Sequence, residues 1–138
     1  MTWVVDTCVV LDVLEDDATF GRRSALCLAR LLSDGLVLCP VSYVELAPAF
    51  NGSLALQDEF LAGLGAPCSE PWTSADTRAA HVAWGVQVAR RRQGLGKKRP
   101  VADVLIGAFA LRFRGLVTRN TGDFAAAFPG LPLVDPAA

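Results

Sequence analysis

The stretch Trp3-Val4-Val5-Asp6 is an apolar run that ends in a carboxylate. We expect a short strand over about residues 2–6, followed by a short helix over about 8–14. A charge beside so much apolar sequence is costly unless it is paired or bound to a metal. The start of the chain therefore predicts a buried strand with an acid, Asp6, at its end.

Three further carboxylates have the same kind of placement. Glu45 lies a few residues past the apolar run 36–39. Asp103 opens a helix-like apolar stretch, and Asp123 follows the short strand 116–118 across a polar turn. Several acids near strand ends and helix starts predict a pocket that holds divalent cations.

The remaining segments alternate between strands and helices. We expect further strands at about 36–39, 116–118 and 132–134, and a short edge strand within 66–72. We expect helices over about 8–14, 20–33, 41–51, 53–64, 74–92, 101–114 and 122–128. This order predicts a three-layer α/β/α sandwich with a mainly parallel central sheet. Such sheets bind ligands outside the carboxyl ends of their strands, so acids far apart in sequence can converge there.

Local signals add detail to three of these helices. Pro48 should bend the helix over 41–51. Ser74 is a suitable N-cap for the long helix, whose inner stripe we expect to be Ala79, Val82, Val86 and Ala89. Asp12, inside the first helix, is interpreted as a surface residue.

The length of 138 residues predicts a single domain spanning 1–138. The hydrophobic content of 52% and the mean hydropathy of +0.37 are high, yet no apolar stretch approaches the ~20 residues needed to span a bilayer. The excess indicates helices buried on most sides, or a protein partner that covers apolar surface. Because the chain starts directly with a strand and lacks a charged leader, we expect a cytoplasmic protein.

Cysteine and histidine usage argues against a zinc site. The only histidine is His81, and no C-x-x-C spacing occurs among the four cysteines, Cys8, Cys27, Cys39 and Cys68. We interpret the cysteines as reduced, small apolar side chains. His81 lies within a predicted helix and is interpreted as a packed or surface residue rather than a catalyst.

The basic residues are unevenly distributed. Six of the 13 fall within one short window: Arg90, Arg91, Arg92, Lys97, Lys98 and Arg99. The net charge of −1 does not by itself indicate a nucleic-acid-binding protein. Two interpretations of the window stay open. It is either a solvated helix end, where cations are favourable, or a basic arm that leads a polyanionic substrate toward Asp103.

The grouping of acids predicts metal-assisted chemistry. Two carboxylates about 4 Å apart repel by roughly 4 kcal/mol at an effective dielectric constant of 20. Four in one pocket are tenable only if some are protonated or a cation is present. Oxygen ligands without histidine favour Mg²⁺ or Mn²⁺, which lower the pKa of a bound water and hold a phosphodiester for in-line attack.

Small polar side chains stand next to these acids: Thr7, Thr118, Arg119, Asn120 and Thr121. They are candidates for orienting a water molecule or a phosphate. The alternative is turn chemistry, since Asn120-Thr121-Gly122 would make a good turn unaided. Both roles stay open for Asn120, and turn formation is the preferred interpretation of Thr121.

The motifs around these residues resemble those of the PIN-domain family. They are Val4-Val5-Asp6-Thr7, Ser42-Tyr43-Val44-Glu45-Leu46, Pro100-Val101-Ala102-Asp103-Val104-Leu105-Ile106 and Leu116-Val117-Thr118-Arg119-Asn120-Thr121-Gly122-Asp123-Phe124. Each motif alone is weak, but four in the family's order are specific, and the resemblance covers essentially the whole chain. A chain of this length is similar to the toxins of VapBC-type toxin–antitoxin pairs.

This resemblance implies a Mg²⁺- or Mn²⁺-dependent endoribonuclease, usually dimeric, that a small antitoxin holds inactive. The family's acidic ligands match Asp6, Glu45, Asp103 and Asp123. Thr118 and Asn120 match polar positions beside the last acid. Family members often have Ser or Asn two places after the first Asp, where this chain has Cys8, and a thiol is a poorer hydrogen-bond partner.

Other interpretations compete with a nuclease. A catalytically silent PIN-like module that binds RNA or protein is the main alternative, and the complete set of acids argues against it. A receiver-type phosphoacceptor domain would need an acidic pair after the first strand, where Thr7-Cys8 stands. A haloacid-dehalogenase-type phosphatase would need a second Asp two residues after Asp6. The sequence thus favours a nuclease, and no membrane association is expected. The resemblance implies RNA as the substrate, and an antitoxin and a second copy of the chain as partners.

Overall fold

The computed structural model describes residues 1–96 and 100–138. Within them, four short strands form one sheet: β1 (Trp3–Val5), β2 (Leu36–Leu38), β3 (Gly115–Val117) and β4 (Leu133–Val134). Their order across the sheet is β2-β1-β3-β4, and all the pairings are parallel. Val4 lies opposite both Val37 and Leu116, which fixes the register of the central strands.

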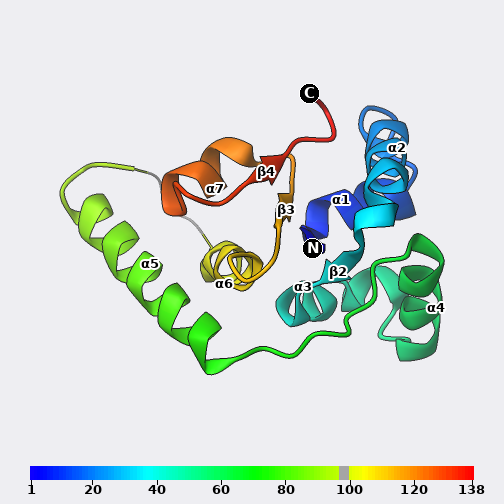
Figure 1. Ribbon diagram of the computed structural model, residues 1–138, viewed down its shortest axis with the longest axis horizontal. Helices are drawn as coiled ribbons and strands as arrows, with labels where there is room; N and C mark the ends of the chain where they lie inside the picture. Colours follow the sequence, from blue (N-terminus) through cyan, green and yellow to red (C-terminus); the bar gives the residue numbers. More distant parts are fainter. Residues whose placement is uncertain (97–99) are drawn as a thin grey trace.

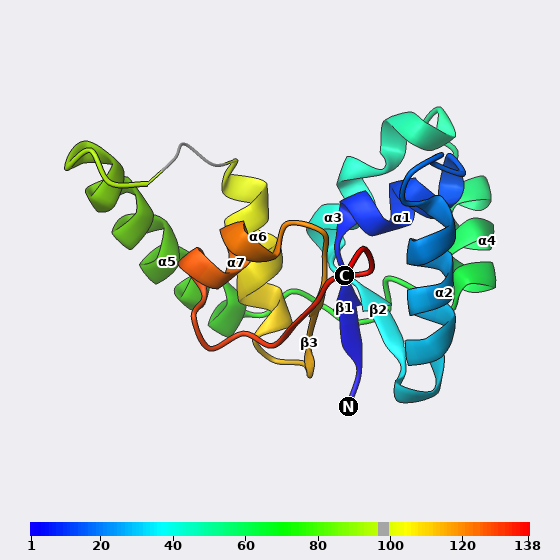
Figure 2. The ribbon, with the colours of Figure 1, turned by 90° about the horizontal axis from the view of Figure 1, so that it is seen from above.

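Helices cover both faces of this sheet. In the described part of the chain they are α1 (Thr7–Leu14), α2 (Gly21–Leu31), α3 (Pro40–Glu45), α4 (Leu54–Leu64), α5 (Ser74–Arg92), α6 (Val101–Ala110), α7 (Thr121–Ala127) and the short 3₁₀ helices η1 (Leu32–Asp34) and η2 (Ala47–Phe50). Helices α1, α2 and α4 lie on one side of the sheet and α5, α6 and α7 on the other, with α5 outside α6 (Figure 1; Figure 2). The predicted three-layer α/β architecture with a parallel sheet is confirmed.

The strands supply two separate cores, because alternate side chains of a strand point to opposite faces. Val5 and Val117 pack with α1, α2 and α4, whereas Val4 and Leu116 pack with α6 and α7. All four are fully buried, and burying a side chain of this kind contributes about 1.5–3 kcal/mol. The sheet is therefore held from both sides although its strands are short.

One predicted strand is absent. Residues 66–72 form no strand, and a single backbone hydrogen bond of 3.0 Å, from Leu38 N to Pro67 O, joins this segment to β2. Pro67 and Pro71 have no N–H to donate, so a ladder of hydrogen bonds cannot develop there.

Two predicted helices are shorter than expected. The helix over 41–51 ends at Glu45 and is followed by η2, because Pro48 cannot donate the hydrogen bond that would continue an α-helix. The helix over 101–114 ends at Ala110, since the chain must turn before β3 begins.

Helix α5 begins with a capping box one residue before the predicted N-cap, Ser74. Thr73 Oγ1 accepts a hydrogen bond of 3.3 Å from Asp76 N, and Asp76 Oδ2 accepts one of 2.9 Å from Thr73 N. Each side chain thus satisfies a backbone donor that the helix start leaves unpaired.

The predicted inner stripe of α5 is wrong at three of its four positions, since only Ala79 is half-buried and packs against the core. Val82 and Val86 are 64% and 56% exposed, and Ala89 is also exposed. The buried positions are Asp76 and Ala80, on the side that packs against α6. Alanine and valine occur on several sides of this helix, so spacing alone did not identify the packed face.

The strand order places a switch point at the carboxyl end of β1. The chain leads from β1 to β2 on one side and later returns to add β3 on the other. Open parallel sheets bind ligands outside the strand ends at such a point. Asp6, the residue after β1, lies there. No helix in residues 1–96 or 100–138 has the length and apolar character to cross a membrane.

Candidate functional site

Asp6 follows β1 and is the N-cap of α1. It is 4% exposed, and its carboxylate accepts hydrogen bonds of 2.8 Å from Thr7 N, 2.7 Å from Thr118 Oγ1 and 3.4 Å from Cys8 Sγ. Burial raises the pKa of Asp6, and the hydrogen bonds from these uncharged donors offset the rise only in part. The negative charge of the nearby Glu45 raises the pKa further. A buried carboxylate with such surroundings favours either a proton or a bound cation.

Glu45 is linked to Asp6 through a single threonine. It is the last residue of α3 and is exposed. Thr7 Oγ1 donates a hydrogen bond of 2.7 Å to Glu45 Oε1, while Thr7 N donates to Asp6. Among the described residues, no lysine or arginine forms an ion pair with either acid. Thr7 therefore holds two carboxylates that have no counter-charge within that part of the chain.

Asp103 and Asp123 form a second pair. Each lies in the first turn of its helix, α6 for Asp103 and α7 for Asp123. Both line one small cavity, together with Val104, Phe124 and Ala127. The packing of α6 against α7 thus brings together two acids from distant parts of the sequence.

The four predicted acids are therefore arranged as two pairs. Among residues 1–96 and 100–138, no three acidic, histidine or cysteine side chains lie close enough together to hold a metal ion. The pairs offer only oxygen atoms, the ligand type that Mg²⁺ and Mn²⁺ prefer. The donor chemistry thus fits the predicted cation, whose binding stays a prediction.

Thr118 and Asn120 follow β3 and connect it to the site. Thr118 is fully buried, and its hydroxyl oxygen accepts a hydrogen bond of 3.0 Å from Asn120 N while donating to Asp6. Asn120 is exposed and precedes α7, but its side chain makes no capping hydrogen bond to this helix. Thr121 is the first residue of α7. Roles of Thr7, Thr118 and Asn120 toward a substrate stay predictions.

Cys8 stands where the resemblance led us to expect Ser or Asn. Burial raises the pKa of the Cys8 thiol to about 12, and the charge of Asp6 contributes in the same direction. The thiol thus stays protonated at neutral pH and donates a weak hydrogen bond to Asp6.

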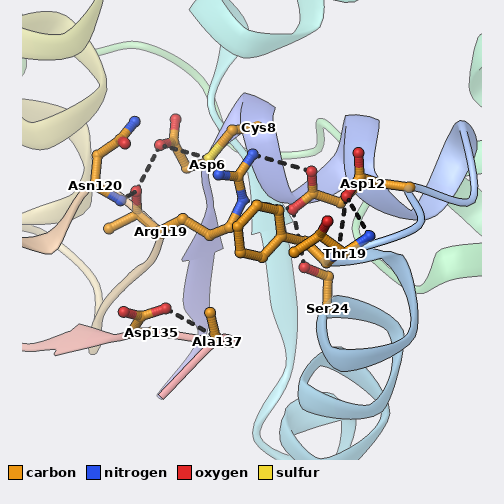
Figure 3. Close-up of polar contacts among 12 residues, drawn as sticks. Asp6, Cys8, Asp12, Thr19, Ser24, Arg119, Asn120, Asp135 and Ala137 are labelled. Carbon is orange, nitrogen blue, oxygen red and sulfur yellow. Dashed lines mark hydrogen bonds and ion pairs between the residues drawn. The ribbon is translucent and has the colours of Figure 1, made fainter.

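Asp12 was predicted to lie at the surface, but it is only 5% exposed. Its carboxylate forms a bidentate ion pair with Arg119, in which Nε donates to Oδ2 at 2.7 Å and Nη2 donates to Oδ1 at 3.0 Å (Figure 3). Ser24 Oγ also donates to Oδ2, at 3.1 Å. The apolar residues around Asp12 were a signal that its charge needed a partner. The partner stands 107 positions later, so local sequence could not identify it.

The basic residues of the predicted RNA-binding arm are only partly described. Arg90, Arg91 and Arg92 end α5 and are exposed, which suits a helix C-terminus. Lys97, Lys98 and Arg99 lie outside the described residues. The arm stays a prediction.

Comparisons with known proteins support the fold. No family model matches the sequence, and no curated protein sequence matches it. A chain of VapBC-1 from nontypeable Haemophilus influenzae has a similar structure, with a TM-score of 0.70, 17% identity and full coverage of both chains. A chain of FitAB bound to IR36 DNA fragment has a TM-score of 0.66 and 21% identity over all of this chain and 96% of that chain. At these identities the likeness shows a shared fold.

Proposed function

We propose that this chain is the toxin of a type II toxin–antitoxin pair, a Mg²⁺- or Mn²⁺-dependent endoribonuclease that a small antitoxin protein holds inactive. The observation that carries the proposal is the buried Asp6 carboxylate at the switch point of the sheet, joined to Glu45 through Thr7 and surrounded by uncharged donors. The fold shared with chains of VapBC-1 and FitAB supports the class of protein.

The proposed metal ligands are Asp6, Glu45, Asp103 and Asp123. When bound by these residues, Mg²⁺ or Mn²⁺ would lower the pKa of a coordinated water and would supply positive charge to a phosphodiester. The chain holds the first two acids in place: Thr118 and the Thr7 backbone engage the two oxygens of Asp6, and the Thr7 hydroxyl engages Glu45. Helix starts carry Asp103 and Asp123, so all four acids stand on or beside regular elements, which favours a defined geometry.

In this proposal, the basic window contacts the RNA backbone. Arg90, Arg91 and Arg92 are exposed at the end of α5, and Lys97, Lys98 and Arg99 precede the helix that carries Asp103. Each contact to a phosphate of a single strand adds about −0.7 to the slope of log affinity against log salt concentration. The window should therefore set affinity and its salt dependence, and leave saturated turnover nearly unchanged.

Partner proteins would cover apolar surface that the described chain leaves open. Val44, Val82, Val86 and Val101 are at least half exposed, and an apolar groove between α5 and α6 includes Trp84. We propose a homodimer and an antitoxin as partners. Light scattering at micromolar concentration tests the dimer, and a result showing only monomer contradicts it. Co-expression with a neighbouring small reading frame tests the antitoxin, and the absence of a stable complex contradicts it.

The nuclease is tested with purified protein, free of antitoxin, on labelled single-stranded RNA with Mg²⁺ or Mn²⁺. We expect cleavage by the unaltered chain and by Glu70→Gln, at an exposed acid in the loop before α5, and none by Asp6→Asn. Binding of RNA without cleavage by the unaltered chain would instead support the catalytically silent module. Equal cleavage by Asp6→Asn would remove Asp6 from the mechanism.

A further inference from the structure

The ion pair between Asp12 and Arg119 attaches the end of β3 to helix α1. Asp12 is nearly inaccessible, and both of its carboxylate oxygens are bound by the Arg119 guanidinium. The Arg119 guanidinium lies against the Phe20 ring, with 4.1 Å between Arg119 Cζ and the ring centroid. Ser24 donates another hydrogen bond to Asp12. The Asp12 carboxylate is therefore enclosed by α1, the following turn and α2, whereas the Arg119 side chain is 27% exposed.

Arg119 stands between two residues that belong to the proposed site. Its predecessor, Thr118, donates its hydroxyl hydrogen to Asp6 at 2.7 Å. Its successor, Asn120, donates its backbone N–H to Thr118 Oγ1 at 3.0 Å. Figure 3 shows Asp6 immediately before α1 and Asp12 within it, with Arg119 reaching across to Asp12 and Asn120 near Asp6.

The segment after β3 is thus attached to α1 at two points. Thr118 bonds to Asp6, which caps the helix, and Arg119 bonds to Asp12 within the helix. The same segment leads directly into α7, which carries Asp123 in its first turn. Because Arg and carboxylate groups in a bidentate pair have a defined mutual orientation, this attachment fixes how residues 118–120 approach the acids.

A direct contact between Arg119 and a phosphate of the RNA, for which the sequence made Arg119 one candidate, would require a different arrangement. The guanidinium would have to leave Asp12, and a buried carboxylate without its partner is strongly unfavourable. The burial of Asp12 and the packing of Phe20 on Arg119 both oppose that movement.

We propose, on the basis of the nuclease function above, that Asp12 and Arg119 are positioning residues. Their ion pair holds the segment after β3 so that the Thr118 hydroxyl stays on Asp6 and Asn120 stays beside it. Neither residue contacts the RNA. This role accounts for a buried charge on α1 that the metal ligands themselves do not require.

The test compares two pairs of variants in the full-length chain. Asp12→Asn and Arg119→Lys weaken the proposed positioning pair, whereas Asp76→Asn and Arg112→Lys weaken a second buried ion pair, between α5 and the end of α6. All are assayed at a temperature where thermal melts show them folded. Changes to partners that orient metal ligands typically cost about 10–100-fold in activity. We expect a kcat loss of that size for Asp12→Asn and Arg119→Lys, with unchanged KM and salt slope, and no kcat change for the control pair.

Two kinetic results would overturn the proposal. The first is a raised KM and a flatter salt slope for Arg119→Lys at unchanged kcat, which would make Arg119 a phosphate contact. The second is an Asp12→Asn variant with the turnover of the unaltered chain.

A second readout does not depend on nuclease activity. The backbone N–H of Asn120 is bonded to Thr118 Oγ1, so its hydrogen exchange reports whether this segment stays in place. We expect at least roughly tenfold faster exchange at Asn120 in Asp12→Asn, because loss of the ion pair lets the segment open locally, and no change in Asp76→Asn. Equal exchange in both variants would overturn the positioning role even if the unaltered chain cleaved RNA. Absence of cleavage by the unaltered chain would refute the nuclease, while the exchange result would still decide whether the pair holds the segment.

Discussion

Two aspartates of this chain are buried to nearly the same degree but have opposite surroundings. Asp6 is 4% exposed and Asp76 is 1% exposed. Asp76 receives Arg112 in a bidentate pair, at 2.6 Å and 2.9 Å, whereas the hydrogen bonds to Asp6 come from uncharged groups. Burial alone would raise the pKa of both. Hydrogen bonds and charge from Arg112 lower the pKa of Asp76, while that of Asp6 stays raised.

The difference separates a structural acid from a candidate catalytic one. The Asp76 carboxylate caps α5, and Arg112 also donates to Pro71 O at 3.0 Å and lies 5.1 Å from the Phe109 ring centroid. This pair therefore ties α5 to the end of α6. Asp6 lies at the switch point of the sheet without a cation of its own in the described residues. A buried carboxylate that lacks a built-in counter-charge is the one available to an external cation.

The largest expected effect is on turnover. Asp6→Asn should reduce RNA cleavage to the background level while largely sparing RNA binding, because it removes a proposed ligand of the metal that activates water. Asp76→Asn should retain the turnover of the unaltered chain when assayed below its melting temperature. Cleavage rates and filter binding measure both quantities. Loss of turnover in both variants would abolish the distinction between the two aspartates.

The free energy of unfolding should change mainly in Asp76→Asn, the variant that is expected to keep its turnover. Breaking a buried ion pair by changing one partner costs about 3–5 kcal/mol. We expect Asp76→Asn to lower the free energy of unfolding by about 3 kcal/mol, the lower end of this range. The reason is that the Arg112 side chain is 31% exposed and can be hydrated. Asp6→Asn should be neutral or stabilising without metal, since it removes a desolvated charge. Urea unfolding without divalent cations measures both, and a greater loss for Asp6→Asn would contradict the comparison.

The two carboxylates should also affect the pH dependence of stability with opposite signs. Because the pKa of Asp76 is lowered in the folded state, the unfolded chain binds more protons at this residue. The stabilisation from ionised Asp76 is therefore present above the ordinary aspartate pKa of about 3.9. It is lost as the pH falls through the lower folded value. The raised pKa of Asp6 means that its ionisation opposes folding as the pH rises above about 3.9. Unfolding free energies between about pH 3 and 7 should therefore show a shallower loss in acid for Asp76→Asn. If Asp76→Asn lost as much free energy of unfolding in acid as the unaltered chain, the pairing of Asp76 with Arg112 would be contradicted.

The smallest expected effect concerns Cys8. Its thiol makes a weak hydrogen bond of 3.4 Å to Asp6, and a serine hydroxyl is a stronger donor. Cys8→Ser should change stability by no more than about 1 kcal/mol and leave turnover near that of the unaltered chain. Cys27→Ser, at a buried cysteine of α2, is the control. A complete loss of cleavage in Cys8→Ser alone would show that the thiol has a role that a hydroxyl cannot supply.

The sequence predicted the fold because its strands are apolar runs that end in turns or acids, as at Val4-Val5-Asp6. It also predicted that acids gather at strand ends, and the structure arranges them as two pairs. It could not predict the partner of Asp12, since the contact with Arg119 depends on how β3 is placed beside β1. The packed face of α5 was missed because small apolar residues occur on several of its sides.

Calorimetric titration with Mn²⁺ in the absence of RNA and antitoxin tests the central claim most directly. The unaltered chain and Asp76→Asn should bind the ion, and their thermal midpoints should rise, since a ligand at a hundredfold excess over Kd stabilises the folded state by about 2.7 kcal/mol. Asp6→Asn should show neither the heat of binding nor the full rise in midpoint. Equal binding by all three proteins, or none by the unaltered chain, would contradict a metal site built on Asp6.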